Sequence, residues 1–217
     1  MSTRPGVAGV VLAAGGGRRM GRPKGLVTVG GVPLVTGACT ALADGGCDPV
    51  GVVVGAAGEE VRPMVADPVA IVVNERWATG IASSLRSALR WAAGLRPAVA
   101  AVVLLPVDTP GIGPMVVRRV IAAWSGADPT HAVVATYGGR PRNPVLLPAA
   151  VWTDVAASVH GDTGARDWLR ADPRRVIEVD CTDLGDPIDL DTPEDLANWT
   201  GRPDVTAAGP TGDPHGA

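Results

Sequence analysis

The chain of 217 residues has the size of one ordinary α/β domain, and its 46 % hydrophobic content is enough for a sizeable core. Its net charge of −3 and pI of about 5.6 argue against a general nucleic-acid binder, which would show a basic face. Three separated cysteines (Cys39, Cys47 and Cys181) and three scattered histidines exclude a disulfide framework and a zinc site with conventional spacing.

The first apolar run, residues 7–14, is too short to span a bilayer. Glycines and arginines follow it at once, which is the reverse of the charge order in a secretory signal. We therefore expect a cytoplasmic protein with no membrane partner and no nucleic-acid partner.

Short valine-rich runs alternate with helical stretches along the chain. The runs suit strands buried on both faces, as in a parallel sheet. Strands are predicted at 7–14, 50–55, 69–74, 99–108, 131–137, 143–147 and 175–180. Helices are predicted at 35–46, 83–94, 113–126, 165–173 and 192–199. The alternation predicts a three-layer, doubly wound α/β fold with a mostly parallel sheet. We expect residues 1–199 to form a single domain and the polar, Gly- and Pro-rich residues 200–217 to be a disordered tail.

A glycine-rich loop follows the first predicted strand. In an open α/β sheet, ligands bind beyond the carboxyl ends of the strands. The glycines at 15–17 would let backbone N–H groups approach a phosphate chain. Three cations lie within seven positions of the same loop: Arg18, Arg19 and Lys24. The loop therefore predicts a phosphate site, with a flexible basic turn as the structural alternative.

Two familiar phosphate loops do not fit this segment. A dinucleotide fingerprint needs a small residue where Met20 stands, and a P-loop needs a G-K-[ST] sequence that the loop lacks. Lys24 is also the single lysine of a chain with 18 arginines. A compact ammonium that reaches a phosphate is one task for which arginine is a poor substitute, although chance is the simpler explanation.

Acidic residues follow the fourth strand and recur near the last helix. Asp108 ends a buried strand, and Asp189 and Asp191 lie two residues apart, on one side of a predicted extended segment. Carboxylates suit a hard cation, so these residues predict a Mg²⁺ site that neutralises charge as pyrophosphate leaves. Alternatively, Asp108 caps a turn and Asp191 caps the final helix. Because of that second alternative, we prefer Asp189 as the metal ligand beside Asp108.

Residues 12–24, LAAGGGRRMGRPK, resemble the signature L-[AG]-[AG]-G-x-x-x-R-M-G-x-x-K of the MobA-like NTP transferases, which have a glycosyltransferase-A-like fold. The resemblance implies that this loop wraps an NTP triphosphate, with Arg19 and Lys24 at the matching basic positions. It also implies that Asp108, in D-x-P, is the family's metal-binding aspartate and that D-x-D-T-P-E-D-L is its second acidic site. The Ala-Ala-Gly start of the loop resembles that of pyrimidine nucleotide users, which favours CTP.

Three later segments resemble molybdenum cofactor cytidylyltransferases. In NERWATGIASSL at 74–85, Asn74 would bind the base or ribose, and the helix opening at Gly80 would receive phosphate or hydroxyl groups with Ser83 and Ser84. Helix capping is the simpler role for the two serines. GRPRNPVLL at 139–147 and GDTGARDWL at 161–169 resemble segments that face the acceptor. Candidates for acceptor binding are Arg142, Asn143 and Arg166, although arginine and asparagine replace the family's usual Gly and His at 142 and 143.

The residues and the resemblance together predict a complete site. The predicted nucleotide-binding residues are Leu12, Ala13, Ala14, Gly15, Gly16, Gly17, Lys24, Asn74, Gly80 and Ser84. The predicted catalytic residues are Arg19, Lys24 and Asp108, and the predicted metal ligands are Asp108 and Asp189. The anionic phosphate of the acceptor would attack the NTP α-phosphorus in line without a general base.

The resemblance implies a particular reaction, the Mg²⁺-dependent transfer of CMP from CTP to molybdopterin, with later handover to a molybdenum enzyme. A guanylyl or sugar-phosphate nucleotidyltransferase and a non-catalytic nucleotide sensor are the alternatives on the same fold. A Rossmann oxidoreductase is disfavoured by the glycine spacing and by the lack of a ribose-binding acid near the end of the second strand.

Overall fold

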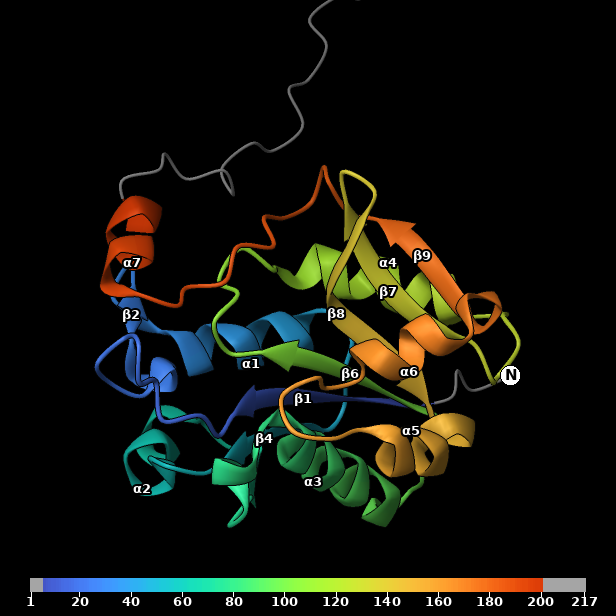
Figure 1. Cartoon of the computed structure of the whole chain (residues 1–217), viewed down its shortest axis with the longest axis horizontal. Helices are drawn as coiled ribbons and strands as arrows, with labels where there is room; N and C mark the ends of the chain where they lie inside the picture. The colour runs from blue at the N-terminus through green and yellow to red at the C-terminus, as the bar shows by residue number, and fades with distance from the viewer. Residues whose placement is uncertain (1–5, 201–217) are drawn as a thin grey trace, which may run out of the picture.

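The computed structural model describes residues 6–200, which form one seven-stranded sheet, a short hairpin and the helices that cover the sheet (Figure 1). The order of the strands is β5-β4-β1-β6-β8-β7-β9. Residue 200, predicted to begin a tail, is instead the last residue of the final helix. The tail predicted over the remaining positions, 201–217, lies outside the described residues.

Every strand predicted from the valine-rich runs is present. The sheet contains β1 (Val7–Ala13), β4 (Val50–Val54), β5 (Ala70–Val73), β6 (Ala101–Pro106), β7 (Ala132–Tyr137), β8 (Arg140–Pro148) and β9 (Val176–Asp180). All neighbouring strands are parallel except β8, which runs antiparallel to both β6 and β7. The prediction of a mostly parallel sheet is therefore confirmed.

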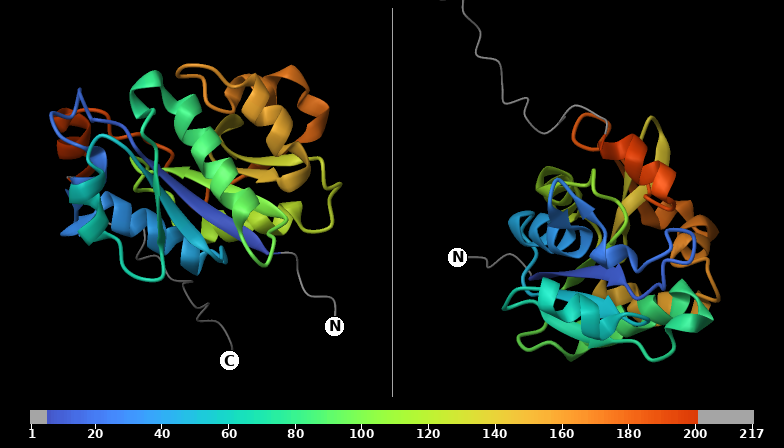
Figure 2. Two further views of the ribbon diagram at one scale, coloured as in Figure 1. Left: turned by 90° about the horizontal axis from the view of Figure 1, so that it is seen from below. Right: turned by 90° about the vertical axis from the view of Figure 1, so that its left-hand side faces the viewer.

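Helices cover both faces of the sheet (Figure 2). On one face lie α1 (Leu34–Asp44) and α4 (Pro114–Trp124), and on the other α3 (Ile81–Gly94) and α5 (Trp152–Ser158). Successive side chains of β1 alternate between the two cores, because a strand points its residues to opposite faces in turn. The helix α3 buries Leu85, Ala88, Leu89 and Ala92, the face that its spacing predicts. The three-layer fold thus follows from strand alternation and helix periodicity.

Several short elements carry no clear sequence signature. They are the hairpin of β2 (Thr28–Val29) and β3 (Val32–Pro33), and the helix α2 (Gly58–Val61). The seven-residue helix α5 was also not predicted. Two further predicted helices are present, α6 (Arg166–Ala171) and α7 (Pro193–Thr200). Within residues 6–200, no helix is long and apolar enough to cross a bilayer.

The direction of strand β8 determines which of its residues lie at the edge of the sheet where the parallel strands end. The parallel strands β1, β4, β5 and β6 all end at this edge, so the loops after them meet there. Strand β8 begins at the same edge, because Leu104 near the end of β6 pairs with Val145. The first residues of β8, including Arg142 and Asn143, therefore lie at the same edge of the sheet as the loop that follows β1.

Candidate active site

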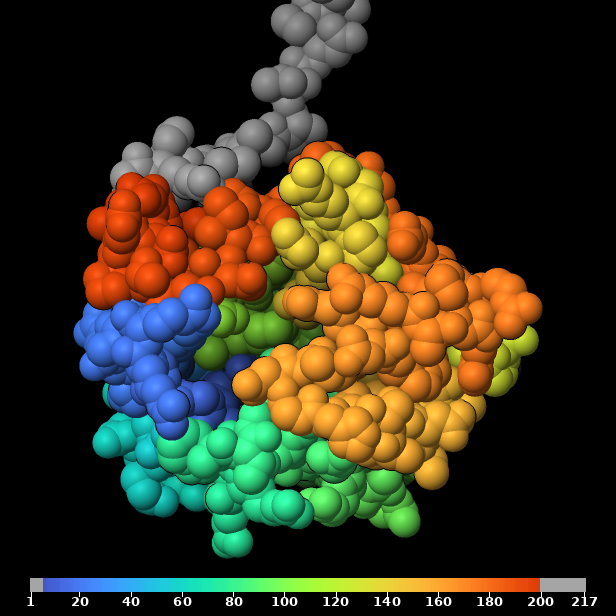
Figure 3. Space-filling view, in the orientation of Figure 1, coloured from blue at the N-terminus to red at the C-terminus, as the bar shows by residue number. Residues whose placement is uncertain are grey.

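Two cavities adjoin at the carboxyl edge of the sheet. The larger has a volume of about 610 Å³ and the smaller about 210 Å³. The space-filling view is hollowed where the N-terminal loop, the loop after β6 and the segments near residues 80 and 160 meet (Figure 3). Four residues line both cavities: Leu12, Ile81, Pro106 and Asp162. Molecules bound in the two cavities would therefore lie next to each other at these four residues.

The larger cavity collects the predicted catalytic residues and all of the predicted nucleotide-binding residues except Asn74. Its lining includes Leu12, Ala13, Ala14, Gly15, Gly16, Gly17, Arg19, Lys24, Gly80, Ser84 and Asp108. Gly17 has φ of 60°, and a Cβ there would lie 1.8 Å from the carbonyl oxygen of Arg22. Only glycine lets the chain turn back so closely. The turn returns the chain to the cavity, where the 3-10 helix η1 (Lys24–Leu26) begins at Lys24.

A cluster of opposite charges lies at the wall of the larger cavity. The Nζ of Lys24 lies 2.5 Å from Oδ2 of Asp108 and 2.6 Å from Oδ1 of Asp191. The same Asp191 oxygen accepts a hydrogen bond of 2.8 Å from Arg19, whose side chain is 71 % exposed. Burial opposes the charge on Lys24, but the two carboxylates outweigh it and the pKa of Lys24 is raised. Lys24 is therefore a cation held between two carboxylates.

The backbone brings the two acidic segments together. The N–H of Leu190 donates to the carbonyl oxygen of Asp108 at 2.8 Å, and the Leu190 side chain is fully buried. The residues on either side of Leu190 line different cavities. Asp191 lines the larger cavity and Asp189 the smaller one. Asp189 and Asp191 thus flank a buried residue and line adjoining cavities, close enough for the Asp191 carboxylate to raise the pKa of Asp189.

The side chain of Asp191 does not cap α7. The backbone N–H groups of Asp191 and Thr192 donate to Oδ2 of Asp195 at 3.0 and 2.8 Å. In return, the N–H of Asp195 donates to Oγ1 of Thr192. This reciprocal capping leaves the Asp191 carboxylate facing Lys24. The reason for preferring Asp189 as a metal ligand is therefore wrong, and Asp191 is the acid that lies beside Lys24.

Asp189 lies in a different electrostatic setting. Its pKa is raised, first because the surrounding protein removes part of its water and second because the carboxylates of Asp108 and Asp191 lie nearby. Arg142 and Lys24 act in the opposite direction. Among residues 6–200, no three His, Cys, Asp or Glu side chains are grouped so that they could hold a metal ion by themselves.

Asn74 does not line either cavity, contrary to its predicted contact with base or ribose. It is 4 % exposed, and its amide nitrogen donates to the hydroxyls of Ser83 and Ser84 at 2.8 and 3.1 Å. Its side-chain oxygen accepts from the N–H of Arg76 at 3.0 Å. Asn74 therefore ties the end of β5 to the start of α3 and shapes the loop between them.

The start of α3 is already bound to another part of the chain. The N–H of Ile81 donates to Oδ1 of Asp162 at 3.3 Å, and the N–H of Ala82 donates to the carbonyl oxygen of Gly161 at 3.0 Å. Arg86 of α3 also donates to the carbonyl oxygens of Ala156 and Val159. These amides were predicted to receive a ligand phosphate, but a carboxylate and a carbonyl of the protein occupy them. The contacts hold the segment that leads to α6 against α3.

Replacing Gly80 with alanine is expected to lower the free energy of unfolding by about 2–3 kcal/mol, the cost of a strained backbone. Gly80 has φ of 105° and ψ of 172°, and a Cβ would lie 2.4 Å from the carbonyl oxygen of Gly161. Urea unfolding measures the change. Gly94→Ala is the matched control, because Gly94 ends the same helix and a Cβ there would meet nothing within 4 Å. Equal destabilisation by both variants would contradict the argument.

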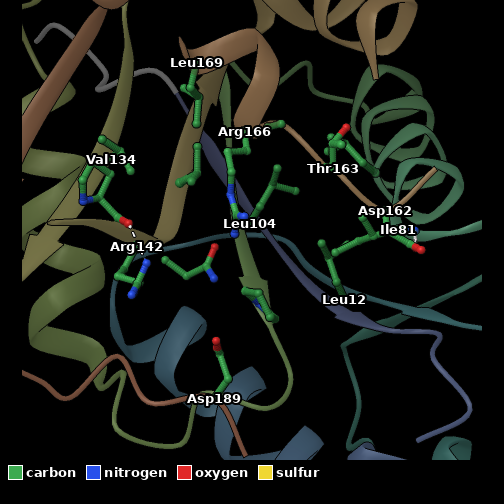
Figure 4. A pocket seen from close by; sticks show the side chains of 17 residues that line it. Leu12, Ile81, Leu104, Val134, Arg142, Asp162, Thr163, Arg166, Leu169 and Asp189 are labelled. Carbon is green, nitrogen blue, oxygen red and sulfur yellow. Dashed lines mark hydrogen bonds between the residues drawn. The ribbon is translucent and has the colours of Figure 1, made fainter. Parts of the chain in front are cut away.

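The smaller cavity collects the predicted acceptor residues (Figure 4). Arg142 reaches it from β8 and Arg166 from α6, and Asp189 approaches from the opposite side. Asn143 also lines it. Most of the remaining wall is apolar: Leu12, Ile81, Leu85, Leu104, Val134, Val145 and Leu169. Such a cavity suits a ligand with an apolar or ring-shaped body and an anionic group.

Two residues at the site were not selected from the sequence: Asp162 lines both cavities and caps α3, and Trp77 lines the larger cavity. A third, Asp191, was considered from the sequence but ranked below Asp189, and it contacts Lys24. Asp162 and Trp77 fall inside the segments that resemble the family, at 161–169 and 74–85, but neither residue belongs to a pattern that marks a ligand.

Comparisons with known proteins agree with this architecture. Residues 9–176 match the family described as the MobA-like NTP transferase domain. Nicotine blue oxidoreductase of Paenarthrobacter nicotinovorans is 34 % identical over 204 residues, which cover 88 % of this chain and 95 % of that protein. Molybdenum cofactor guanylyltransferase of Rhodobacter capsulatus is also 34 % identical over 204 residues, covering 90 % and 96 %. The crystal structure of Rv0371c from Mycobacterium tuberculosis H37Rv in complex with manganese has a TM-score of 0.71 and 28 % identity, covering 90 % of this chain and 98 % of that one.

The three-layer architecture, with a mostly parallel sheet whose first strand runs into a basic glycine-rich loop, is the α/β fold of the nucleotidyltransferases. The family match covers most of the chain, and the relatives align over nearly their whole length. The chain belongs to the MobA-like NTP transferase family.

Proposed function

We propose that this protein transfers CMP from CTP to the terminal phosphate of molybdopterin and releases pyrophosphate. The observation that carries the proposal is the pair of adjoining cavities. One is lined by the glycine loop and by the charge cluster around Lys24, and the other by Arg142 and Arg166. A donor nucleotide in the first cavity and a phosphorylated acceptor in the second would place the reacting phosphates at the shared wall.

The choice of nucleotide rests on the start of the loop, Ala13-Ala14-Gly15, which resembles that of pyrimidine nucleotide users. The relative from Rhodobacter capsulatus is named a guanylyltransferase, so GTP is the competing donor. The molybdopterin acceptor is supported by that same name and by the two arginines of the smaller cavity. A cytoplasmic location and handover to a molybdenum enzyme belong to the same proposal.

The residues at the larger cavity fit a divalent metal ion. Asp108 and Asp191 direct carboxylate oxygens at one common cation, the Lys24 ammonium, so the pair is arranged around a positive charge. Mg²⁺ is commonly bound by one or two carboxylates, with phosphate and water oxygens completing its shell. A related structure contains manganese, which supports a divalent ion. We propose Asp108 and Asp191 as the protein ligands, and Asp189, the ligand predicted earlier, as the alternative to Asp191. The ion would neutralise charge on the leaving pyrophosphate.

Residues of the chain would bind the two substrates and orient their phosphates. Backbone N–H groups of the glycine loop, together with Lys24 and Arg19, would hold the triphosphate, and Arg142 and Arg166 would hold the acceptor phosphate. An oxygen of the acceptor phosphate forms a bond to the α-phosphorus while the bond from that phosphorus to the bridging oxygen breaks. Because the attacking oxygen is already anionic, no side chain needs to remove a proton.

The test is pyrophosphate release from purified protein with molybdopterin, Mg²⁺ and each of the four common NTPs in turn. We expect release with CTP that depends on both the acceptor and the metal. Release with GTP instead would correct the nucleotide and retain the reaction. If folded protein releases no pyrophosphate with any NTP, the proposed transfer is wrong; binding without turnover would then indicate a nucleotide sensor.

A second candidate is an oxidoreductase on the same fold, because one relative carries that name at 34 % identity. The largely apolar smaller cavity suits a planar aromatic substrate as well as it suits a pterin. Electrons would come from a dissociable carrier such as a reduced nicotinamide dinucleotide, whose pyrophosphate would lie on the glycine loop. Oxidation of that dinucleotide, dependent on an aromatic dye and independent of NTP, would support this candidate over the transferase.

A further inference from the structure

Trp77 is the one aromatic side chain among the described residues that line the two cavities. Aromatic residues are scarce in this chain, which has six tryptophans, one tyrosine and no phenylalanine. Trp77 is only half-buried, and it lies in the wall of the cavity that contains the glycine loop. Part of the Trp77 side chain packs against the core on the α3 side of the sheet, and part of it lines the cavity, where a ligand could contact it.

Two glycines make room for the indole. A Cβ on Gly55 would lie 2.5 Å from Cβ and 2.7 Å from Cγ of Trp77. A Cβ on Gly16 would lie 3.6 Å from Cζ3 and 3.8 Å from Cη2. The indole therefore extends from Gly55 after β4 to Gly16 in the glycine loop. A side chain at position 55 would displace it, so its place is set by direct contact with the backbone.

The backbone that carries Trp77 is also held in place. Trp77 begins the 3-10 helix η3 (Trp77–Thr79), and its N–H donates to the carbonyl oxygen of Asn74 at 3.3 Å. The Trp77 carbonyl oxygen accepts from the N–H of Gly80 at 3.2 Å. The buried Asn74 side chain fixes the same loop through Arg76 and Ser84. Both the ring and the backbone of Trp77 are thus fixed in position.

We propose that Trp77 is the wall against which the base of the bound nucleotide lies, an inference that rests on the proposed use of a nucleotide in this cavity. The glycine loop beside the indole offers N–H groups to phosphates, and the indole offers a flat apolar surface next to it. Bases stack favourably on aromatic side chains whatever their identity. Trp77 therefore contributes affinity for the nucleoside, and groups at the edges of the base select which nucleotide binds.

The test distinguishes the contribution of the nucleoside to binding affinity from that of the phosphates. Binding of CTP and of inorganic tripolyphosphate, each with Mg²⁺, is measured by calorimetry for the wild type, Trp77→Leu and Trp77→Phe. We expect Trp77→Leu to weaken CTP binding on the order of 10- to 100-fold, as removal of a stacking ring does, while tripolyphosphate binding is unchanged. Trp77→Phe should retain a large part of the affinity. The control is Trp168→Leu in α6, because Trp168 lines neither cavity.

Each other outcome overturns the inference in a recognisable way. Equal loss of CTP and tripolyphosphate binding would mean that Trp77 only shapes the loop, and unchanged CTP binding would mean that it contributes nothing. If the wild type binds tripolyphosphate but no nucleotide, the proposed function fails together with the inference. Should Trp77→Leu not fold, quenching of tryptophan fluorescence by CTP decides: we expect it in the wild type and its loss in Trp77→Phe, and its persistence there would refute the proposal.

Discussion

Lys24→Ala is expected to lower the turnover number by on the order of 10²- to 10³-fold, the usual cost of losing one preorganised group that stabilises transition-state charge. The Lys24 side chain is only 17 % exposed and lies between two carboxylates at the cavity wall. Its ammonium is thus in place before substrate arrives. The measurement is the steady-state rate of pyrophosphate release at saturating NTP and Mg²⁺.

The control for Lys24 is Arg22→Ala in the same loop. Arg22 is exposed and does not line either cavity, so its removal should leave turnover nearly unchanged. Thermal unfolding of both variants verifies that the fold is intact. If folded Lys24→Ala retains the wild-type rate, the glycine loop does not hold the reacting phosphates and its assignment is wrong.

Asp108→Asn is expected to reduce turnover on the order of 10³-fold and to raise the Mg²⁺ concentration needed for half of the maximal rate. Asp108 and Asp191 face the same cation, so removing the charge of Asp108 leaves one carboxylate to hold a divalent ion. The measurement is turnover as a function of Mg²⁺ concentration, together with binding of Mn²⁺ in the presence of an unreactive NTP analogue.

Asp191→Asn and Asp189→Asn decide which acid is the second ligand. Asp191→Asn should shift the metal dependence in the same direction as Asp108→Asn. Asp189→Asn should change the KM for the acceptor instead, because Asp189 lines the smaller cavity. The reverse pattern would restore Asp189 as the metal ligand, and unchanged metal affinity in all three variants would remove the metal site from this cluster.

Local patterns explain why so much of the fold could be predicted. The valine-rich strands are buried on both faces, so their runs are unbroken and easily recognised. The glycines and cations that led us to predict phosphate binding lie within one short segment, 12–24, and the structure places most of them at one cavity. Residues whose position depends on a single turn or strand end could therefore be placed at the site from the sequence.

Contacts between distant segments explain what could not be predicted. Asp162 caps the N-terminus of α3 across 81 positions, which no local pattern records. The Asp191 carboxylate is free to contact Lys24 because the Asp195 side chain caps α7 instead. Asn74 looked like a ligand because it ends a strand at the functional edge, but its polar atoms turn inward to Ser83, Ser84 and Arg76. In each case a partner elsewhere in the chain decided the role of the residue.

The reversed strand β8 has a consequence for how this protein could acquire new chemistry. Strands β5, β4, β1 and β6 form a continuous parallel block, and β8 separates that block from β7 and β9. Residues of β8 itself and of α6, namely Arg142, Asn143 and Arg166, supply three of the six polar side chains that line the smaller cavity. Mutations there can reshape the smaller cavity, where we propose that the acceptor binds, while the parallel block with its glycine loop keeps its geometry. Directed evolution confined to 140–143 and 163–169 should therefore yield altered preference for the proposed acceptor with binding of the proposed donor preserved.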